Sequence, residues 1–240
     1  SSGTRISSYG AGSTVHILNA GSIGYWWASN TGVVIDGYTG GVRDTKLTVS
    51  YYDSGSFSQH WESKPGNSTT GYTQDVQMKD MNNDGKKDII RCMGNEIQIY
   101  NFTTTGSGFS LAGNFSANPW VISLGTSGFC NVADVDGDGT MDIITKVGYN
   151  GRVILGPSYS ISKGMGYSSH LVEIQPYDLD LDGEQELIIT RSTGSKGSVH
   201  EIDSSSNIGA ETWKGGGRRN TKETALGDIN GDRLVDMVQF

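Results

Sequence analysis

Four short acidic segments recur along the chain, and together their composition and spacing constrain the fold. The segments are Asp80–Asp88, Asp134–Asp142, Asp178–Glu186 and Asp228–Asp236. Each places oxygen-bearing side chains at its first, third, fifth and ninth positions. Such a pattern wraps a hard cation such as Ca²⁺, which takes six to eight oxygen ligands at about 2.3–2.6 Å. The segments therefore predict metal-binding loops, and their repetition predicts a repeat architecture.

The residues predicted to hold metal occupy positions one, three, five, seven and nine of each loop. They are Asp80, Asn82, Asp84, Lys86 and Asp88; Asp134, Asp136, Asp138, Thr140 and Asp142; Asp178, Asp180, Asp182, Glu184 and Glu186; and Asp228, Asn230, Asp232, Leu234 and Asp236. The fourth loop carries Arg233 where the others have glycine. A non-glycine residue at positive φ is uncommon, so we expect this loop to be strained or differently shaped, and to be the weakest calcium site.

An EF-hand is the first alternative, because its loop begins with the same oxygen pattern. It also needs a bidentate glutamate at position twelve and a helix on each side. The twelfth residues here are Arg91, Thr145, Ile189 and Gln239. None is a carboxylate, and short apolar runs rich in β-branched residues follow the loops, which indicates strands. We therefore expect strand–loop–strand hairpins.

The spacing of the loops predicts a β-propeller. Their first residues lie 54, 44 and 50 positions apart, and a period near 50 with several short strands per unit is typical of propeller blades. A fifth, decayed copy at Asp36–Asp44 keeps both terminal aspartates but lacks carboxylates at positions three and five, so we expect no metal there. The sequence thus predicts an all-β, five-bladed propeller over residues 1–240, with DxDxDGxxD-type calcium loops between the first two strands of its blades.

The two ends of the chain predict how the ring closes. Val235–Phe240 has the pattern of the second strand of a blade, whereas Thr4–Tyr9 and Thr14–Leu18 are predicted strands without a preceding acidic loop. We expect one blade to be completed by both termini, because closure removes exposed sheet edges.

These repeats resemble the FG-GAP or VCBS family of calcium-binding propeller repeats, which also occur in integrin α-subunit heads, some fungal lectins and certain polysaccharide lyases. The resemblance covers four repeats well and the fifth poorly. It implies a propeller with about four calcium ions, and by itself it does not imply one activity.

The acidic balance of the chain is explained by the loops. The formal charge is −8, and 14 of the 26 acidic residues lie at positions one, three, five and nine of the loops. The rest of the chain has more basic than acidic residues, and four Ca²⁺ ions would bring the molecule close to neutral. No concentrated basic field remains, so we expect no nucleic-acid partner. No run of eighteen apolar residues predicts a membrane span, and a start at Ser without a leader indicates a processed product.

An extracellular, secreted location is expected, because weak extracellular calcium modules bind at about 10⁻⁴–10⁻³ M. Sequons at Asn67, Asn101 and Asn114 permit glycosylation in a secreted protein. Cys92 and Cys130 could form a disulfide or stay as buried thiols, and the sequence leaves this open.

Candidate ligand-binding residues are aromatic or basic, and they are Tyr25, Trp26, Trp27, Trp213, Arg218 and Arg219. The aromatic rings could stack on the apolar face of a sugar, or fill the wedges between blades. Three consecutive aromatic residues cannot all face one core in a strand, so at least one is expected at the surface. The two arginines could bind a carboxylate or sulfate, or belong to a solvated turn.

No catalytic motif is present, and the four histidines are far apart. Carboxylates bound to Ca²⁺ stay ionised, so they are poor general acids for a glycosidase. The resemblance instead implies an extracellular binding or adhesion module with lectin-like recognition, whose partner is a carbohydrate or an extracellular protein. Two alternatives stay open: a polysaccharide lyase or hydrolase propeller, or a domain of one, and a calcium-dependent structural subunit of a surface layer, pilus or fibre.

Overall fold

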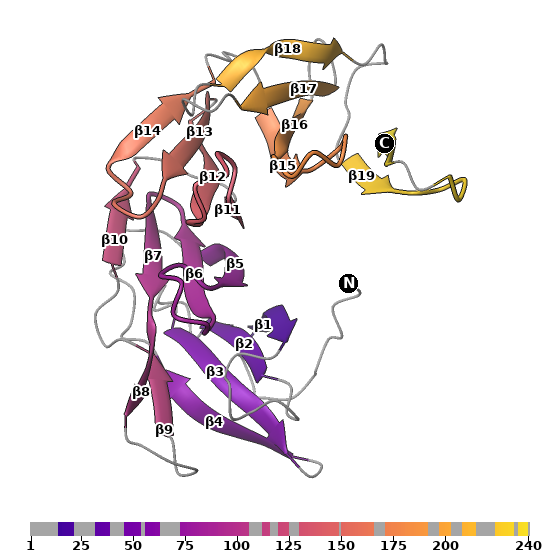
Figure 1. Ribbon diagram of the computed structural model, residues 1–240. Helices are drawn as coiled ribbons and strands as arrows, with labels where there is room; N and C mark the ends of the chain where they lie inside the picture. The colour runs from indigo at the N-terminus through magenta and orange to yellow at the C-terminus, as the bar shows by residue number, and fades with distance from the viewer. Residues whose placement is uncertain are drawn as a thin grey trace. The chain divides into compact units, whose positions relative to one another are not determined.

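The computed structural model describes strands at 14–21, 32–38, 46–53 and 56–62, and residues 73–105, 112–115, 120–124, 130–148, 150–165, 171–191, 197–202, 208–214, 224–232 and 235–239. Within these ranges there are twenty strands and no helix (Figure 1). All strand pairs are antiparallel. The predicted all-β class is confirmed. The described part of the chain holds no helix of the length and apolar character that crossing a membrane requires.

The chain divides into two compact units, Ser1–Gly128 and Phe129–Phe240. The first unit contains a sheet of order β1-β2-β3-β4, with strands Thr14–Gly21, Gly32–Tyr38, Lys46–Asp53 and Ser56–Glu62. Its second sheet has the order β10-β7-β6-β5 and is built from Trp120–Ser123, Glu96–Tyr100, Asp88–Met93 and Thr73–Lys79. The hairpin of β8 and β9, Phe102–Thr105 and Ala112–Phe115, is inserted between β7 and β10.

The second unit contains two four-stranded meanders and one pair of strands. The first meander, β11-β12-β13-β14, consists of Cys130–Ala133, Asp142–Val147, Asn150–Leu155 and Ile161–Gly164. The second, β15-β16-β17-β18, consists of Leu171–Tyr177, Glu186–Arg191, Gly197–Ile202 and Ile208–Lys214. The remaining strands, β19 and β20, are Thr224–Gly227 and Asp236–Gln239.

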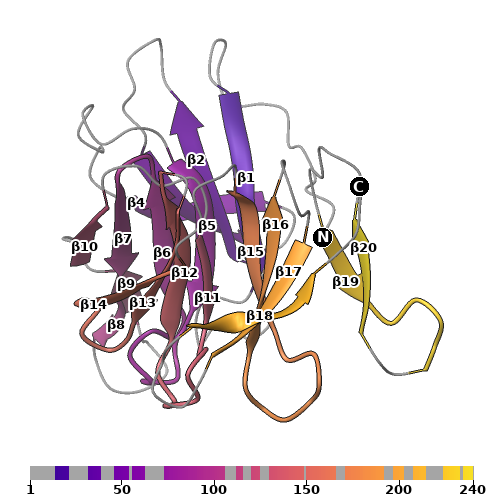
Figure 2. The same ribbon diagram turned by 90° about the horizontal axis from the view of Figure 1, so that it is seen from above.

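Each acidic segment joins the first two strands of its sheet: β5 to β6, β11 to β12, β15 to β16 and β19 to β20. Figure 2 shows the β15–β16 connection, in orange, extending beyond the ends of its strands. The hairpin interpretation of the loops is therefore confirmed over that of an EF-hand. The closed ring, its five blades and the blade shared by both termini stay predictions. Thr14–Leu18 lies within β1, whereas Thr4–Tyr9 is outside the described residues.

The structure differs from the sequence prediction at the decayed fifth loop. Asp36 lies inside β2, opposite His16 of β1 and Leu47 of β3, whereas the first aspartate of each other loop follows its strand directly. The segment also joins the second and third strands of its sheet, not the first two. The Asp or Asn side chains found at positions three and five of the other loops are replaced here by Tyr38 and Gly40, so the strand continues through Asp36. Asp44 is outside the described residues.

The core of the second unit lies between its two meanders. It contains Val135, Ile144, Val153, Leu155, Met165, Leu171, Ile174, Leu187, Ile189 and Ile202. The second strands of the meanders are buried on both faces at Ile143–Thr145 and Leu187–Thr190, which explains their continuous apolar runs. Gly151 permits close packing, because a Cβ there would lie 2.4 Å from the Met165 sulfur.

Both cysteines are disulfide-bonded, which answers the question that the sequence left open. Cys92 lies in β6 and Cys130 in β11, and both side chains are fully buried. Disulfides persist in oxidising environments such as the extracellular space. The bond is therefore compatible with the expected extracellular setting.

Candidate metal centre

The four acidic loops follow one backbone plan. The first residue of each loop directly follows a strand, and the ninth begins the next strand. Hairpin pairing therefore brings the two ends together, as in Lys79 opposite Asp88 and Ala133 opposite Asp142. Position four has positive φ in every loop, at Asn83, Gly137, Leu181 and Gly231, and so does the position-six glycine of the first three loops. Glycine and asparagine adopt this conformation at low cost, so the local sequence accounts for most of the turn.

Leu181 is the exception at position four, with φ of 64° and 66% of its surface exposed. Replacing Leu181 with glycine is expected to stabilise the protein by about 1 kcal/mol, because a Cβ in the left-handed region is strained. Urea unfolding at fixed calcium would measure the change. Leu181→Ala is the matched control: it keeps the Cβ and should give no comparable gain. Equal stabilisation by both variants would contradict strain as the cause.

Loop carboxylates accept hydrogen bonds from the loop's own backbone. In three loops Oδ2 of the first aspartate accepts from the N–H of the glycine at position six, at 2.8 Å for Asp80–Gly85, 2.9 Å for Asp134–Gly139 and 3.1 Å for Asp178–Gly183. The third side chain accepts from the fifth N–H in all four loops. The fifth accepts from the seventh N–H in the first three. These bonds curl the chain around the oxygens.

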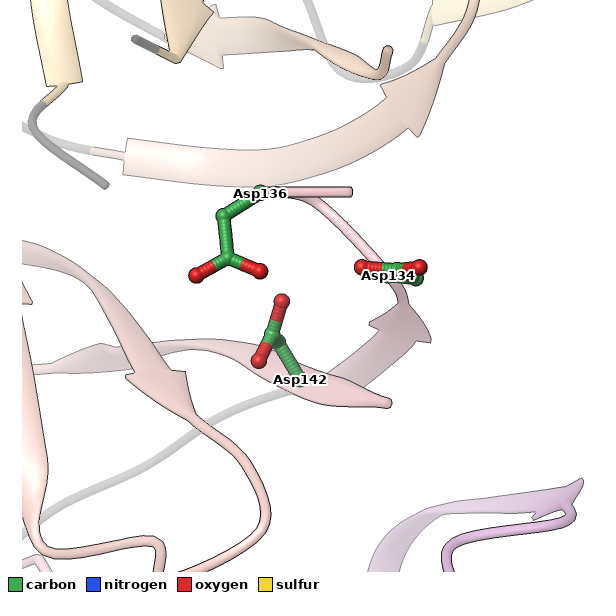
Figure 3. A group of neighbouring side chains, drawn as sticks. All are labelled: Asp134, Asp136 and Asp142. Atoms are coloured by element: carbon green, nitrogen blue, oxygen red, sulfur yellow. The ribbon is translucent and has the colours of Figure 1, made fainter. Parts of the chain in front are cut away.

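Two loops gather three carboxylates each. Oxygens of Asp134, Asp136 and Asp142 lie within 4.8 Å of one another (Figure 3), and the same holds for Asp178, Asp180 and Glu186. These are positions one, three and nine of their loops. The carboxylates of Asp136 and Asp142 face each other in the figure. The aspartates at position five, predicted as ligands, belong to neither group and are exposed.

One carboxylate oxygen in each cluster is buried without a hydrogen-bond donor among the described residues. Oδ1 of Asp134 and Oδ1 of Asp178 are buried and accept no hydrogen bond from any described residue. A buried polar atom without a partner is costly, and a charged one more so. The two atoms occupy the same position in two separate loops. In each loop, a cation bound among the three carboxylates would compensate the charge of this oxygen. The residues present therefore fit a metal ion, and these two clusters could hold one.

The ninth carboxylate anchors its loop to the rest of the sheet. Asp88 and Asp142 are fully buried, and Oδ2 of each accepts from the N–H of the second loop residue, at 3.0 and 2.9 Å. Their Oδ1 atoms accept from residues beyond the third strand, Phe102 N at 2.7 Å and Gly156 N at 2.8 Å. One side chain thus links the start of the loop, the second strand and the end of the third strand.

Burial makes these anchoring carboxylates weaker acids than usual. It raises the pKa of Asp88 and the pKa of Asp142 to about 6, although two backbone hydrogen bonds oppose the shift in each case. Nearby loop aspartates add to the rise by repulsion. Burial likewise raises the pKa of Glu186, with repulsion from Glu201 and two loop aspartates. A divalent cation would favour the ionised forms of these carboxylates. The buried carboxylates therefore fit a bound metal ion.

The described part of the fourth loop shares bonds with the other loops, and the different shape expected from Arg233 stays a prediction. Oδ1 of Asp228 accepts from Gly231 N at 2.6 Å and Asp232 N at 3.1 Å, which are positions four and five of the loop. Its anchor is retained, because Asp236 Oδ2 accepts from Ile229 N at 2.9 Å. Arg233 and Leu234 are outside the described residues.

The remaining predicted site residues lie outside the acidic loops. Trp213 is 46% exposed on β18, whereas the residues outside the described part of the chain are Tyr25, Trp26, Trp27, Arg218, Arg219 and the sequon Asn67. Asn101 is half-buried between β7 and β8, and Asn114 lies in β9. Trp213, Asn101 and Asn114 are not members of the two carboxylate clusters, and their roles stay predictions.

A buried polar cluster in the second meander was missed by sequence reasoning. Arg191 Nη2 donates to Ser198 Oγ at 2.7 Å and lies 3.4 Å from Glu211 Oε2. His200 Nε2 lies 3.1 Å from the same hydroxyl, and burial lowers the pKa of His200. These residues come from β16, β17 and β18 with no motif to connect them. Arg191 Nη2 and both ring nitrogens of His200 have partners within the sheet, which suits a structural role.

The fold and the loops together define a class of antiparallel repeat proteins with acidic hairpin loops. Residues 80–145, which include the first two acidic loops, match the family model of an FG-GAP-like repeat. The match supports an FG-GAP-type repeat family, in agreement with the resemblance of the loops. No curated protein gives a significant match to the chain.

Proposed function

We propose that the protein is a calcium-stabilised binding module of the β-propeller type, which acts outside the cell and recognises carbohydrate in a lectin-like manner. An FG-GAP repeat suggests a β-propeller-like binding or adhesion module. The observation that supports calcium is the repeated cluster of three carboxylates, each with a buried oxygen that accepts no hydrogen bond from the described residues.

The donor chemistry favours calcium over other divalent ions. Both clusters consist of carboxylates, and their loops contain no histidine or cysteine. Oxygen-only sites suit Ca²⁺, Mg²⁺ or Mn²⁺, whereas zinc and copper prefer nitrogen or sulfur. A curled nine-residue loop offers flexible, variable coordination, which suits Ca²⁺ better than the rigid octahedron of Mg²⁺. We propose that positions five and seven complete the coordination, and that the first and fourth loops bind two further ions.

In this proposal calcium has a structural role. The ninth carboxylate already connects the loop to the end of the third strand through backbone hydrogen bonds. An ion bound to the same carboxylate would make the loop part of that connection. The carboxylates would then stay ionised and would be unavailable as general acids. Recognition is assigned to other surfaces that the sheets hold in place.

Trp213 supports the carbohydrate part of the proposal. The residue is 46% exposed on β18, and an exposed aromatic side chain suits the apolar face of a sugar ring. The disulfide supports the extracellular part, because such bonds form in oxidising compartments.

A glycan array probed with the whole chain in millimolar calcium tests this function. We expect binding to at least one glycan class, and we expect Trp213→Ala to weaken it without changing the melting temperature. Absence of binding to every glycan would contradict the lectin role. Release of unsaturated uronates from a polysaccharide would instead identify a lyase, and ordered filaments in calcium would identify a structural subunit.

A further inference from the structure

The residue at position three divides the four acidic loops into two pairs. Asp136 and Asp180 stand there in the loops 134–142 and 178–186, which we call the Asp loops. Asn82 and Asn230 stand there in the loops 80–88 and 228–236, which we call the Asn loops. The Asp loops therefore have four carboxylates at positions one, three, five and nine, and the Asn loops have three.

The same division appears in the hydrogen bonds of the first aspartate. In both Asn loops, Oδ1 of that residue accepts from the N–H of position five, at 3.1 Å for Asp80–Asp84 and 3.1 Å for Asp228–Asp232. In both Asp loops the corresponding atoms, Oδ1 of Asp134 and of Asp178, are buried and accept no hydrogen bond from the described residues. Two independent pairs of loops thus show the same difference.

Electrostatic repulsion explains why the two pairs of loops differ. In an Asn loop the neutral amide does not repel the first carboxylate, and a backbone N–H compensates the charge of that carboxylate without a metal. In an Asp loop a second carboxylate adds repulsion, and the buried oxygen lacks compensation. A cation therefore relieves more unfavourable energy in an Asp loop. Calcium affinity in acidic loops also depends on the number of charged ligands.

We propose that the chain has two classes of calcium site: the two Asp loops bind first and tightly, and the two Asn loops fill only at higher calcium concentration. This inference rests on the proposed calcium binding and adds the order in which the four loops bind the ion. Both Asp loops adjoin one hydrophobic core, since Val135 of the first loop and Leu187, next to Glu186 of the second, belong to the same buried cluster. Filling the tight sites would accordingly stabilise Phe129–Phe240 before the Asn loops are occupied.

Calcium titration of the whole metal-free chain by calorimetry tests the order. We expect two equivalents to bind tightly and any further equivalents to bind about tenfold or more weakly. Asp136→Asn should reduce the tight stoichiometry from two to one, and adding Asp180→Asn should reduce it to zero. The reciprocal variant Asn82→Asp should raise it to three. A gain of affinity cannot result from misfolding, so this variant decides the question even if the loss variants fold poorly.

The outcomes separate this inference from the proposed function. Four equivalent sites, or an unchanged tight stoichiometry in Asn82→Asp, would overturn the two classes and leave calcium binding intact. A titration without any calcium binding would overturn the proposed calcium role itself. Circular dichroism of each variant at saturating calcium establishes that the fold is retained.

Discussion

Removal of calcium with EDTA is expected to lower the melting temperature by about 10–20 °C. A site held at a hundred times its Kd contributes about 2.7 kcal/mol of stability, and the two carboxylate clusters would contribute twice that. For a chain of this size 1 kcal/mol corresponds to about 2–4 °C. Without the ion, repulsion among Asp134, Asp136 and Asp142 and the uncompensated Oδ1 of Asp134 remain in the folded state.

Thermal melts followed by circular dichroism measure this effect, with metal content checked by elemental analysis. Restoring excess calcium should return the original melting temperature, and magnesium at the same ionic strength should return only part of it. The magnesium arm is the control for screening of surface charge. An unchanged melting curve after verified metal removal would refute the structural role of calcium.

Replacing Asp142 with alanine is expected to destabilise the protein by about 2–6 kcal/mol even in EDTA. The carboxylate is fully buried and accepts hydrogen bonds from Val135 N and Gly156 N. Its removal leaves two backbone donors without an acceptor, at about 1–3 kcal/mol each. In calcium the loss should be larger, because a metal ligand disappears as well. Urea unfolding in both conditions separates the two contributions.

Asp138→Ala in the same loop is the matched control. Asp138 is exposed and its hydrogen bonds are local, to Thr140, so in EDTA its replacement should cost less than about 1 kcal/mol. Asp142→Asn keeps one acceptor oxygen and should fall between the two. Equal losses for Asp138→Ala and Asp142→Ala in EDTA would contradict the anchoring role.

The features that depend on neighbouring residues could be predicted from the sequence. The loops, their hairpin form and the strands after them all follow from patterns within about a dozen residues. The left-handed backbone of Gly139 is of the same kind. These conformations depend on glycine placement and on side chains bonded to nearby backbone, which a linear pattern records.

Contacts between distant parts of the chain could not be predicted. The bonds from Phe102 N to Asp88 and from Gly156 N to Asp142 span fourteen residues, and they depend on where the third strand ends. The buried pairing of Arg191 with Ser198 depends likewise on strand register. At Asp36 the local pattern was misleading. Its spacing to Asp44 matches an acidic loop, but Asp36 lies within β2, which pairs with a strand on each side.

The double-sided burial of the second strands has a consequence for how these sheets avoid mispairing. A strand with one buried face resists slippage, because moving by one residue would turn its apolar side chains to water. Ile143 and Ile144 are both buried, so β12 has no alternation of apolar and polar residues. A pairing shifted by one residue would still bury apolar side chains. Asp142 at its first residue removes the ambiguity, since only one alignment places the carboxylate against Val135 N and Gly156 N. The last carboxylate of the acidic loop thus fixes the register of a strand whose apolar residues alone would not specify it.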